Sequence, residues 1–437
     1  MKFTHPLYLV LVACCLSGLL PQQACKAKDP SVALAAAEQR ELRRSAVYRG
    51  LTSVSEQTRR RTILNCRQQS IHLRAELTSL VAASRQHITS SEDEKNIRTS
   101  TSQLLYLIGS LPEPEVESLF IDALDSPLLG IRLISTDILG QFQFHGAIDA
   151  LKQQASRPEY QASYGYRFNL LRAFTRMHHP DAIDFLTAVH PTLNGQLKHL
   201  IGTALESVTA SDFMGDEERF SEWKARETEK EETKDENGQD KIVFKTAGYE
   251  SESLNRIKFA KPQYYGIDIN AQRMMFIIDH SSSMEDYWAG MSRLARAKLE
   301  LIKVIRELPE ETEFAIMFFE TKVRVWRKEL LIANEDNKLE AIAFIRRLGF
   351  GDRTNTYGAL RQSLNFDQDL EAVFLLTDGQ PTIGETVLPQ KILIDILGRN
   401  RFRHLNFNTI GIAVNPKTEA FLQQLATGSG GEYRRAL

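Results

Sequence analysis

The feature that most constrains the fold is a regular alternation of two kinds of segment in residues 262–437. Short runs of almost continuous apolar residues are separated by longer stretches with apolar residues at helical spacing. Apolar strands that alternate with amphipathic helices indicate a sheet covered by helices on both faces, so we predict an α/β, doubly wound, Rossmann-like domain. The less apolar segment VRVWRK is expected to form a short antiparallel edge strand. The other expected strands are RMMFIID, EFAIMFFE, AVFLLTD and FNTIGIAV, and the expected helices are MSRLARAKLELIKVIREL, NKLEAIAFIRRL, TYGALRQSL, LPQKILIDILGRN and TEAFLQQLA.

Residues 101–210 have a different pattern, in which short helices follow one another in three pairs. The sequences GAIDAL at 146–151 and DAIDFL at 181–186 lie 35 positions apart. Helix pairs with this period indicate an α-solenoid, and an irregular helical bundle is the alternative. The first helix of each pair is expected to end at a proline, namely Pro127, Pro158 or Pro191.

This segment resembles HEAT repeats, most clearly at GIRLISTDILGQFQFHGAIDALKQQ. Arg132 stands early in the second helix of its pair, and Asp137 stands further along the same helix. The resemblance implies a surface for binding or spacing rather than for catalysis.

Two polar regions flank the repeats. Residues 28–100 are predicted to be a polar helical region, in which the tract Arg59 to Arg61 is expected to lie on a solvated face. Residues 211–261 are highly charged and predicted to be a linker, solvated or loosely helical, because they cannot bury much apolar surface. Within this linker, KIVFKTAG is a candidate strand.

The N-terminus predicts export. An apolar stretch of 14 residues from Leu7 to Leu20 is too short for a comfortable membrane span and suits a signal peptide over residues 1–27, cleaved after Ala27 or Ala24. A lipoprotein modified at Cys14 and an uncleaved anchor are the alternatives. The expected location is the periplasm, the cell surface or the extracellular space.

Net charge and cysteine content limit which partners and which covalent cross-links are expected. A net charge of -2 gives no reason to expect nucleic acid as a partner, and a membrane is expected only through an N-terminal anchor. Cys66 is the only cysteine outside the leader region, so an internal disulfide is not expected.

Oxygen-bearing side chains follow the expected strands and predict a metal site. Asp279, Ser281 and Ser283 follow RMMFII, Thr354 lies in a loop that opens a helix, and Asp378 follows AVFLLT. Ligands of open parallel sheets bind outside the carboxyl ends of the strands, where these side chains would meet. Oxygen donors suit a hard cation such as Mg²⁺, with Mn²⁺ or Ca²⁺ as alternatives. Neutral hydroxyls would leave the cation electron-poor and able to accept an external carboxylate.

These residues resemble the metal-ion-dependent adhesion site of von Willebrand factor A domains in order and spacing, and the resemblance extends over residues 272–437. It implies that Asp279, Ser281 and Ser283 lie on the metal, that Thr354 contacts it directly or through water, and that Asp378 acts through water. With the HEAT-like repeats, the chain resembles secreted bacterial proteins that contain this domain.

Two positions depart from the family pattern. Ser282 and Arg353 stand where many members have glycine. Serine resists backbone angles that glycine tolerates, so Ser282 is expected to strain the loop. Arg353 is expected to place a cation near the metal, where it would weaken metal binding or hold an acidic ligand.

The leading hypothesis is therefore an exported, metal-dependent protein for adhesion or assembly. The metal would capture an Asp or Glu side chain of a partner protein, and the helical repeats would provide a second surface. A scaffold that binds through its repeats is one alternative, with the A domain purely structural.

An enzyme for metal-dependent phosphoryl transfer is the other alternative. Haloacid-dehalogenase-type enzymes need an aspartate where this chain has Ser281, and the sequence has no GxxxxGK, HExxH or GxSxG motif. We therefore do not expect an enzyme.

Overall fold

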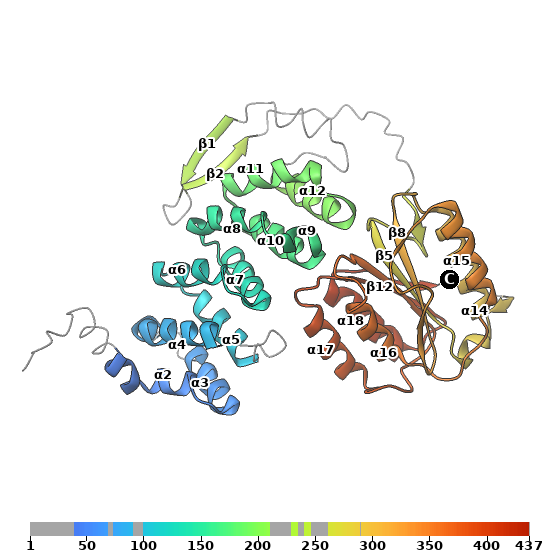
Figure 1. Ribbon diagram of the computed structural model, residues 1–437, viewed down its shortest axis with the longest axis horizontal. Helices are drawn as coiled ribbons and strands as arrows, with labels where there is room; N and C mark the ends of the chain where they lie inside the picture. The colour runs from blue at the N-terminus through green and yellow to red at the C-terminus, as the bar shows by residue number, and fades with distance from the viewer. Residues whose placement is uncertain are drawn as a thin grey trace, which may run out of the picture.

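The computed structural model describes residues 39–68, 73–90, 99–209, 229–234, 240–245, 261–288 and 290–436. Figure 1 shows two parts side by side: a series of helices coloured blue to green, and an α/β domain coloured yellow to red. The expected leader lies outside the described residues.

The α/β domain is built on one mixed sheet with the strand order β10-β8-β5-β11-β12-β13, and β9 also pairs with β8. Strands β8, β5, β11, β12 and β13 are parallel, whereas β9 and β10 run antiparallel to β8. The predicted antiparallel edge strand is confirmed, because VRV of VRVWRK forms β9. The strands are β5 (Arg273–Asp279), β8 (Glu313–Phe319), β9 (Val323–Val325), β10 (Leu331–Ile332), β11 (Ala372–Thr377), β12 (Asn406–Ile412) and β13 (Tyr433–Ala436). Two-residue strands form the pairs β3 (Gln263–Tyr264) with β4 (Ile267–Asp268) and β6 (Tyr287–Trp288) with β7 (Met291–Ser292).

The side chains of β5 show why a continuous apolar run suits this sheet. Phe276 and Ile278 belong to the hydrophobic cluster on one face, and Met275 and Ile277 belong to the cluster on the other. Successive strand residues point to opposite faces, so an uninterrupted apolar strand fills two cores. Helices α14 (Arg293–Glu307) and α15 (Glu335–Arg347) cover the first face. Helices α16 (Thr356–Leu364), α17 (Pro389–Asn400) and α18 (Pro416–Ser429) cover the second.

The N-terminal part is helical, as predicted, and its described residues share one hydrophobic cluster that extends from Leu51 to Leu205. The arrangement as a HEAT-like solenoid stays a prediction. The helices are α2 (Ala46–Leu51), α3 (Glu56–Gln68), α4 (Leu77–Ser90), α5 (Thr99–Gly109), α6 (Pro114–Ala123), α7 (Leu129–Gln141), α8 (Ile148–Gln154), α9 (Pro158–Ala162), α10 (Tyr164–Met177), α11 (Pro180–Val189) and α12 (Gly195–Thr209). Shorter 3₁₀ turns are η2 (Arg74–Glu76), η4 (His145–Ala147) and η5 (His190–Thr192).

The predicted helix ends at prolines are only approximate. Helices α6, α8 and α11 end before Pro127, Pro158 and Pro191, and Pro158 begins α9. Proline suits the first turn of a helix, because its missing N–H has no intrahelical partner there. The second helix of the middle pair, expected over EYQASYGYRFNLLRAFTRM, is two helices, α9 and α10. Ser163 is extended, and its side chain caps α10 by accepting a hydrogen bond from Tyr166 N.

Arg59 contradicts the expectation of a solvated arginine face. Its side chain is 2% exposed, forms an ion pair with Glu56 and donates from Nε to Ser100 Oγ at 3.0 Å. Burial is possible because these groups and two backbone carbonyls satisfy the guanidinium. Arg60 and Arg61 are exposed, as expected.

The two residues singled out in α7 join neighbouring helices. Arg132 donates to Ser126 O at 2.8 Å and forms an ion pair with Glu159 of α9. Asp137 accepts from Arg176 Nη1 of α10 at 2.8 Å and also from the hydroxyl of Tyr106 in α5. Polar contacts of these two residues therefore connect α7 to three other helices, α5, α9 and α10.

The charged linker contains a two-stranded antiparallel ribbon. Strand β1 (Glu229–Lys234) pairs with β2 (Asp240–Lys245). Of the candidate strand KIVFKTAG, the residues KIVFK lie in β2, and the last three lie outside the described residues. The rest of the predicted linker up to residue 260 lies outside the described residues.

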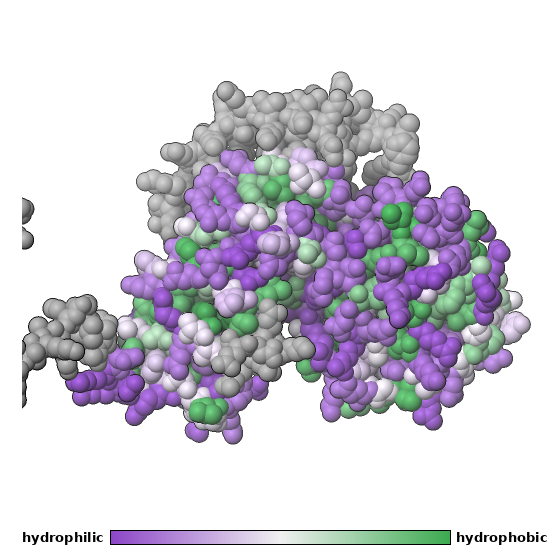
Figure 2. All heavy atoms as spheres, viewed as in Figure 1, coloured by the Kyte–Doolittle hydropathy of each residue, from purple (hydrophilic) through white to green (hydrophobic). Residues whose placement is uncertain are grey.

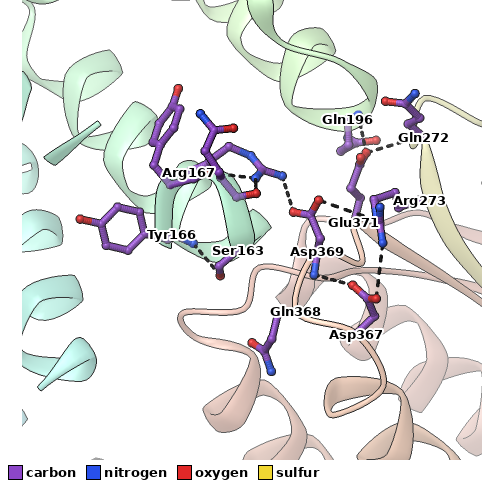
Figure 3. A network of polar contacts seen from close by, with 12 residues as sticks. Ser163, Tyr166, Arg167, Gln196, Gln272, Arg273, Asp367, Gln368, Asp369 and Glu371 are labelled. Carbon is purple, nitrogen blue, oxygen red and sulfur yellow. Dashed lines mark hydrogen bonds and ion pairs between the residues drawn. The ribbon is translucent and has the colours of Figure 1, made fainter. Parts of the chain in front are cut away.

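A polar network joins the helical part to the α/β domain (Figure 3). Arg167 of α10 forms an ion pair with Asp369, and the Glu371 carboxylate accepts from Gln196 N at 2.8 Å and from Gln272 N at 3.1 Å. Glu371 is buried, and this burial raises its pKa to about 7, while the two backbone N–H groups oppose the shift.

A second cluster continues the same interface. The ring of Phe168 stacks on His404 with centroids 4.1 Å apart, and His404 Nε2 lies 3.0 Å from Asn169 Oδ1. Arg401 donates to Ser102 Oγ at 2.9 Å and lies over the ring of Tyr106. The contact therefore extends from α5 to α12.

The interface lies at the amino ends of the parallel strands. Gln272, Glu371 and Leu405 immediately precede β5, β11 and β12. Glu371 contacts the start of α12, while residues 402 to 404, just before β12, contact α10. The helical part therefore contacts the sheet edge opposite to the carboxyl ends where the predicted metal ligands lie.

Candidate metal centre

Asp279 is the last residue of β5 and is fully buried. Its Oδ1 accepts from Ser281 N at 2.9 Å, and its Oδ2 accepts from Thr377 Oγ1 at 2.6 Å. Thr377 is the last residue of β11, the strand beside β5, so the sheet itself fixes this second contact. Sequence reasoning did not identify Thr377, although its place directly before Asp378 was a signal.

The electrostatics at Asp279 favour a nearby cation. Burial raises the pKa of its carboxyl to about 7, the negative charge of Asp378 adds to the shift, and the hydrogen bonds from Thr377 and Ser281 oppose it. A positive charge beside the two carboxylates would stabilise their ionised form.

The serine loop connects the two aspartates. Ser281 Oγ lies 3.2 Å from Ser283 Oγ, and Ser283 Oγ donates to Asp378 Oδ1 at 2.8 Å. The loop forms the 3₁₀ turn η6 (Ser282–Glu285), which the fully buried Met284 anchors in the core. Four of the five predicted ligands are therefore linked by a chain of hydrogen bonds.

The loop of Thr354 reaches the same edge. Gly351 N donates to His280 O at 2.6 Å, and Ser282 N donates to Asp352 O at 3.0 Å, so this loop is joined to the serine loop. A Cβ atom placed on Gly379 would lie 3.7 Å from Ser283 Oγ and 3.8 Å from Thr354 Oγ1. The structure thus brings both Thr354 and Ser283 close to the residue that follows Asp378.

The structure describes both positions that depart from the family pattern. Ser282 lies in a right-handed 3₁₀ turn and is not among the described residues with positive φ, so the expected backbone strain is absent there. The Arg353 side chain is largely exposed, and its ion-pair partner is Asp352 at 4.0 Å rather than either ligand aspartate.

Arg293 instead supplies the cation at this edge. This first residue of α14 places Nη1 2.7 Å from Asp378 Oδ2, and the same nitrogen donates to Ser283 O at 3.2 Å. The Asp378 side chain is 0% exposed, so the pair is shielded from solvent. Sequence reasoning missed Arg293, although it opens the helix that follows the serine loop.

The donor set fits a hard cation. It consists of carboxylate and hydroxyl oxygens from three loops at one sheet edge. Within the described ranges, no group of three or more His, Cys, Asp or Glu side chains is arranged to hold a metal. Any cation held here would therefore depend on hydroxyl donors as well as carboxylates.

Comparison with known proteins agrees with the fold. Residues 272–435 match the family described as "von Willebrand factor type A domain". Human von Willebrand factor A domain-containing protein 3B is 33% identical over 159 residues, which cover 36% of this chain and 11% of that protein. Mouse inter alpha-trypsin inhibitor, heavy chain 4, is 25% identical over 179 residues, which cover 38% of this chain and 18% of that protein.

Among solved structures, a von Willebrand factor type A protein from Catenulispora acidiphila has a TM-score of 0.33 and 20% identity, covering 39% of this chain and 40% of that one. The matches to the human and mouse proteins cover 11% and 18% of those proteins, so this chain spans less than a fifth of the length of each. In the part of the chain that the structure describes, no helix is long and apolar enough to cross a membrane.

Proposed function

Since residues 272–435 form a von Willebrand factor type A domain, we propose that this protein binds a partner protein through a divalent cation. The ligands would be Asp279, Ser281, Ser283, Thr354 and Asp378. The observation that supports the proposal best is that hydrogen bonds and loop contacts join these residues, which come from three separate loops.

The chemistry of the donors favours capture of an acidic group. Mg²⁺ prefers oxygen ligands, with Mn²⁺ and Ca²⁺ as alternatives. When bound, the cation would supply an electron-poor centre for an external carboxylate. Asp279 and Asp378 supply two negative charges, and the positive charge of Arg293 offsets part of them. The partner would therefore contribute an Asp or Glu side chain.

The helical part would supply a second interaction surface. Its contacts lie at the amino ends of the strands, so it leaves the carboxyl ends to the partner. We further propose export to the periplasm, the cell surface or the exterior, on the basis of the apolar N-terminal stretch. We propose no catalytic role.

The first experiment is thermal unfolding of the full chain in EDTA and in Mg²⁺, Mn²⁺ or Ca²⁺. A cation at about 100 times its dissociation constant should stabilise the fold by about 2.7 kcal/mol. Asp279→Ala should abolish the shift. Asp352→Ala is the matched control, because this exposed carboxylate is nearby and only its backbone carbonyl contacts the serine loop.

Absence of any cation-dependent shift in the wild-type chain would contradict the proposal. Partner binding that persists in EDTA and in Asp279→Ala would favour the scaffold alternative, in which the helical part alone binds.

A further inference from the structure

Helices α14 and α15 lie on the side of the α/β domain away from the helical part (Figure 1). Residues of both helices line two hollows. One hollow of about 760 Å³ and another of about 270 Å³ share Arg306 and Arg346, so they adjoin each other, and together they are here called the α14–α15 groove. Figure 2 shows apolar atoms among hydrophilic ones on this side of the domain.

Exposed apolar side chains line the groove. Leu299 of α14 is 56% exposed and Leu339 of α15 is 63% exposed, and the buried Ile302 and Ile342 also contribute to the lining. The core of the domain does not need Leu299, since α14 packs on the sheet through other residues, among them Leu301. Leu299 and Leu339 therefore give each hollow an apolar side chain that a ligand could cover.

The same groove is rich in positive charge. Its lining contains five basic side chains and two acidic ones, Glu307 and Glu335. The basic residues are Lys298, Lys303, Arg306, Lys338 and Arg346.

Some of these cations already have partners and some are available. Lys298 Nζ donates to Arg346 O at 3.2 Å, and Lys338 lies 3.6 Å from Glu335. Among the described residues, no carboxylate lies within ion-pair distance of Lys303, Arg306 or the guanidinium of Arg346. These three charges are therefore available to a ligand.

We propose that the α14–α15 groove binds an acidic, amphipathic segment of a partner protein. The apolar side chains of such a segment would cover Leu299 and Leu339, and its carboxylates would face Lys303 and Arg306. Single-stranded nucleic acid fits less well, because no aromatic side chain lines the groove to stack on bases. An anionic membrane also fits less well, because the surface is concave and contains Glu307 and Glu335.

This surface does not depend on the metal site, so both can be tested separately. The probe is a set of fluorescein-labelled synthetic peptides with leucines at helical spacing and glutamates elsewhere, and the matched peptides carry lysine for glutamate. Fluorescence anisotropy is measured with the full chain in EDTA. The acidic peptides should bind, the basic ones should not, and added salt should weaken binding.

Charge reversal tests the location of the binding surface. Lys303→Glu with Arg306→Glu should weaken binding of the acidic peptides at least about tenfold. Leu299→Ser should weaken it as well, with little salt dependence of the loss. The control is Lys391→Glu with Lys417→Glu, which reverses two exposed charges elsewhere in the domain.

Three outcomes would overturn the proposal: no acidic peptide binds, the control reversal weakens binding as much, or binding survives the Lys303 and Arg306 changes. Sedimentation of the chain with phosphatidylserine vesicles that needs the same two cations, without peptide binding, would assign the groove to a membrane. Self-association that the same reversal abolishes would assign it to a second copy. Because EDTA is present throughout, failure here leaves the cation-dependent function intact.

Discussion

Asp378 is placed to interact with two cations, the guanidinium of Arg293 and the proposed metal ion. Its Oδ2 already lies 2.7 Å from Arg293 Nη1, and the proposed cation would lie at the same sheet edge. Arg293 holds the Asp378 carboxylate in place and also lowers the net negative charge of the site. The second effect should decide how tightly the cation binds.

We predict that Arg293→Gln strengthens cation binding about tenfold, since it removes a repulsion of about 1 to 2 kcal/mol between a guanidinium and a divalent ion. Isothermal titration of the full chain with Mn²⁺ measures the change. Arg353→Gln is the control and should have little effect, because the Arg353 side chain is largely exposed and points to Asp352. Weaker binding in Arg293→Gln would show that its hydrogen bond to Ser283 O matters more than its charge.

At the scale of residues, the sequence predicted the candidate metal ligands but not the side chains that contact them. Asp279 ends a strand, and Ser281, Ser283 and Asp378 follow one, which is a local signal. The sequence positions of Thr377 and Arg293 were weak signals, and their contacts with the aspartates join residues 98 and 85 positions apart, which a local pattern does not show.

At the scale of elements, the approach of α7 to α10 depends on a residue without a side chain. A Cβ on Gly140 of α7 would lie 2.4 Å from Ala173 Cα and 2.8 Å from Ala173 O of α10. The obstructing atoms are mostly backbone, so the helices would have to move apart.

We predict that Gly140→Ala destabilises the helical part by about 1 to 3 kcal/mol through overpacking, despite the higher helix propensity of alanine. Urea unfolding followed by far-ultraviolet circular dichroism measures this. Gly398→Ala in α17 is the matched control: nothing lies within 4 Å of its added Cβ, so helix propensity alone should stabilise it by up to about 1 kcal/mol. Equal effects of the two changes would refute the packing argument.

Patterns in the sequence predicted the central strands of the α/β domain well, because their middle residues form apolar runs, as Met274 to Ile278 do in β5. They predicted the helical part less well. The break at Ser163 depends on a side-chain cap, and the burial of Arg59 depends on Ser100, more than forty residues away. Periodicity contains neither kind of information.

At the scale of the whole molecule, the junction of the two parts buries an acid. Glu371 faces Arg167 and Asp369 and accepts hydrogen bonds from Gln196 N and Gln272 N. Its folded-state pKa of about 7 is above its ordinary value of 4.5. The folded state therefore binds this proton more tightly than the unfolded state does.

We predict that the contribution of Glu371 to stability falls as pH rises from about 4.5 to about 7 and is lowest above that range. Glu371→Gln keeps the acceptor oxygen and removes the charge, so the variant should unfold at a higher temperature than the wild type at pH 8 and lack this pH dependence. Thermal unfolding across the range tests it, with the exposed Glu310→Gln as control. A lower melting temperature for Glu371→Gln at pH 8 would count against the assignment.

The helical part and the proposed partner would contact opposite ends of the central strands, and this placement has a mechanical consequence. The helical part holds the amino ends of the strands, and a captured partner would hold the carboxyl ends, so a pulling force between them would run along the strand axes. The hydrogen bonds of β5 with β8 and β11 lie across that direction. Such a load shears many of these bonds together instead of opening them one at a time, which makes the central sheet the part of the protein best suited to transmit tension.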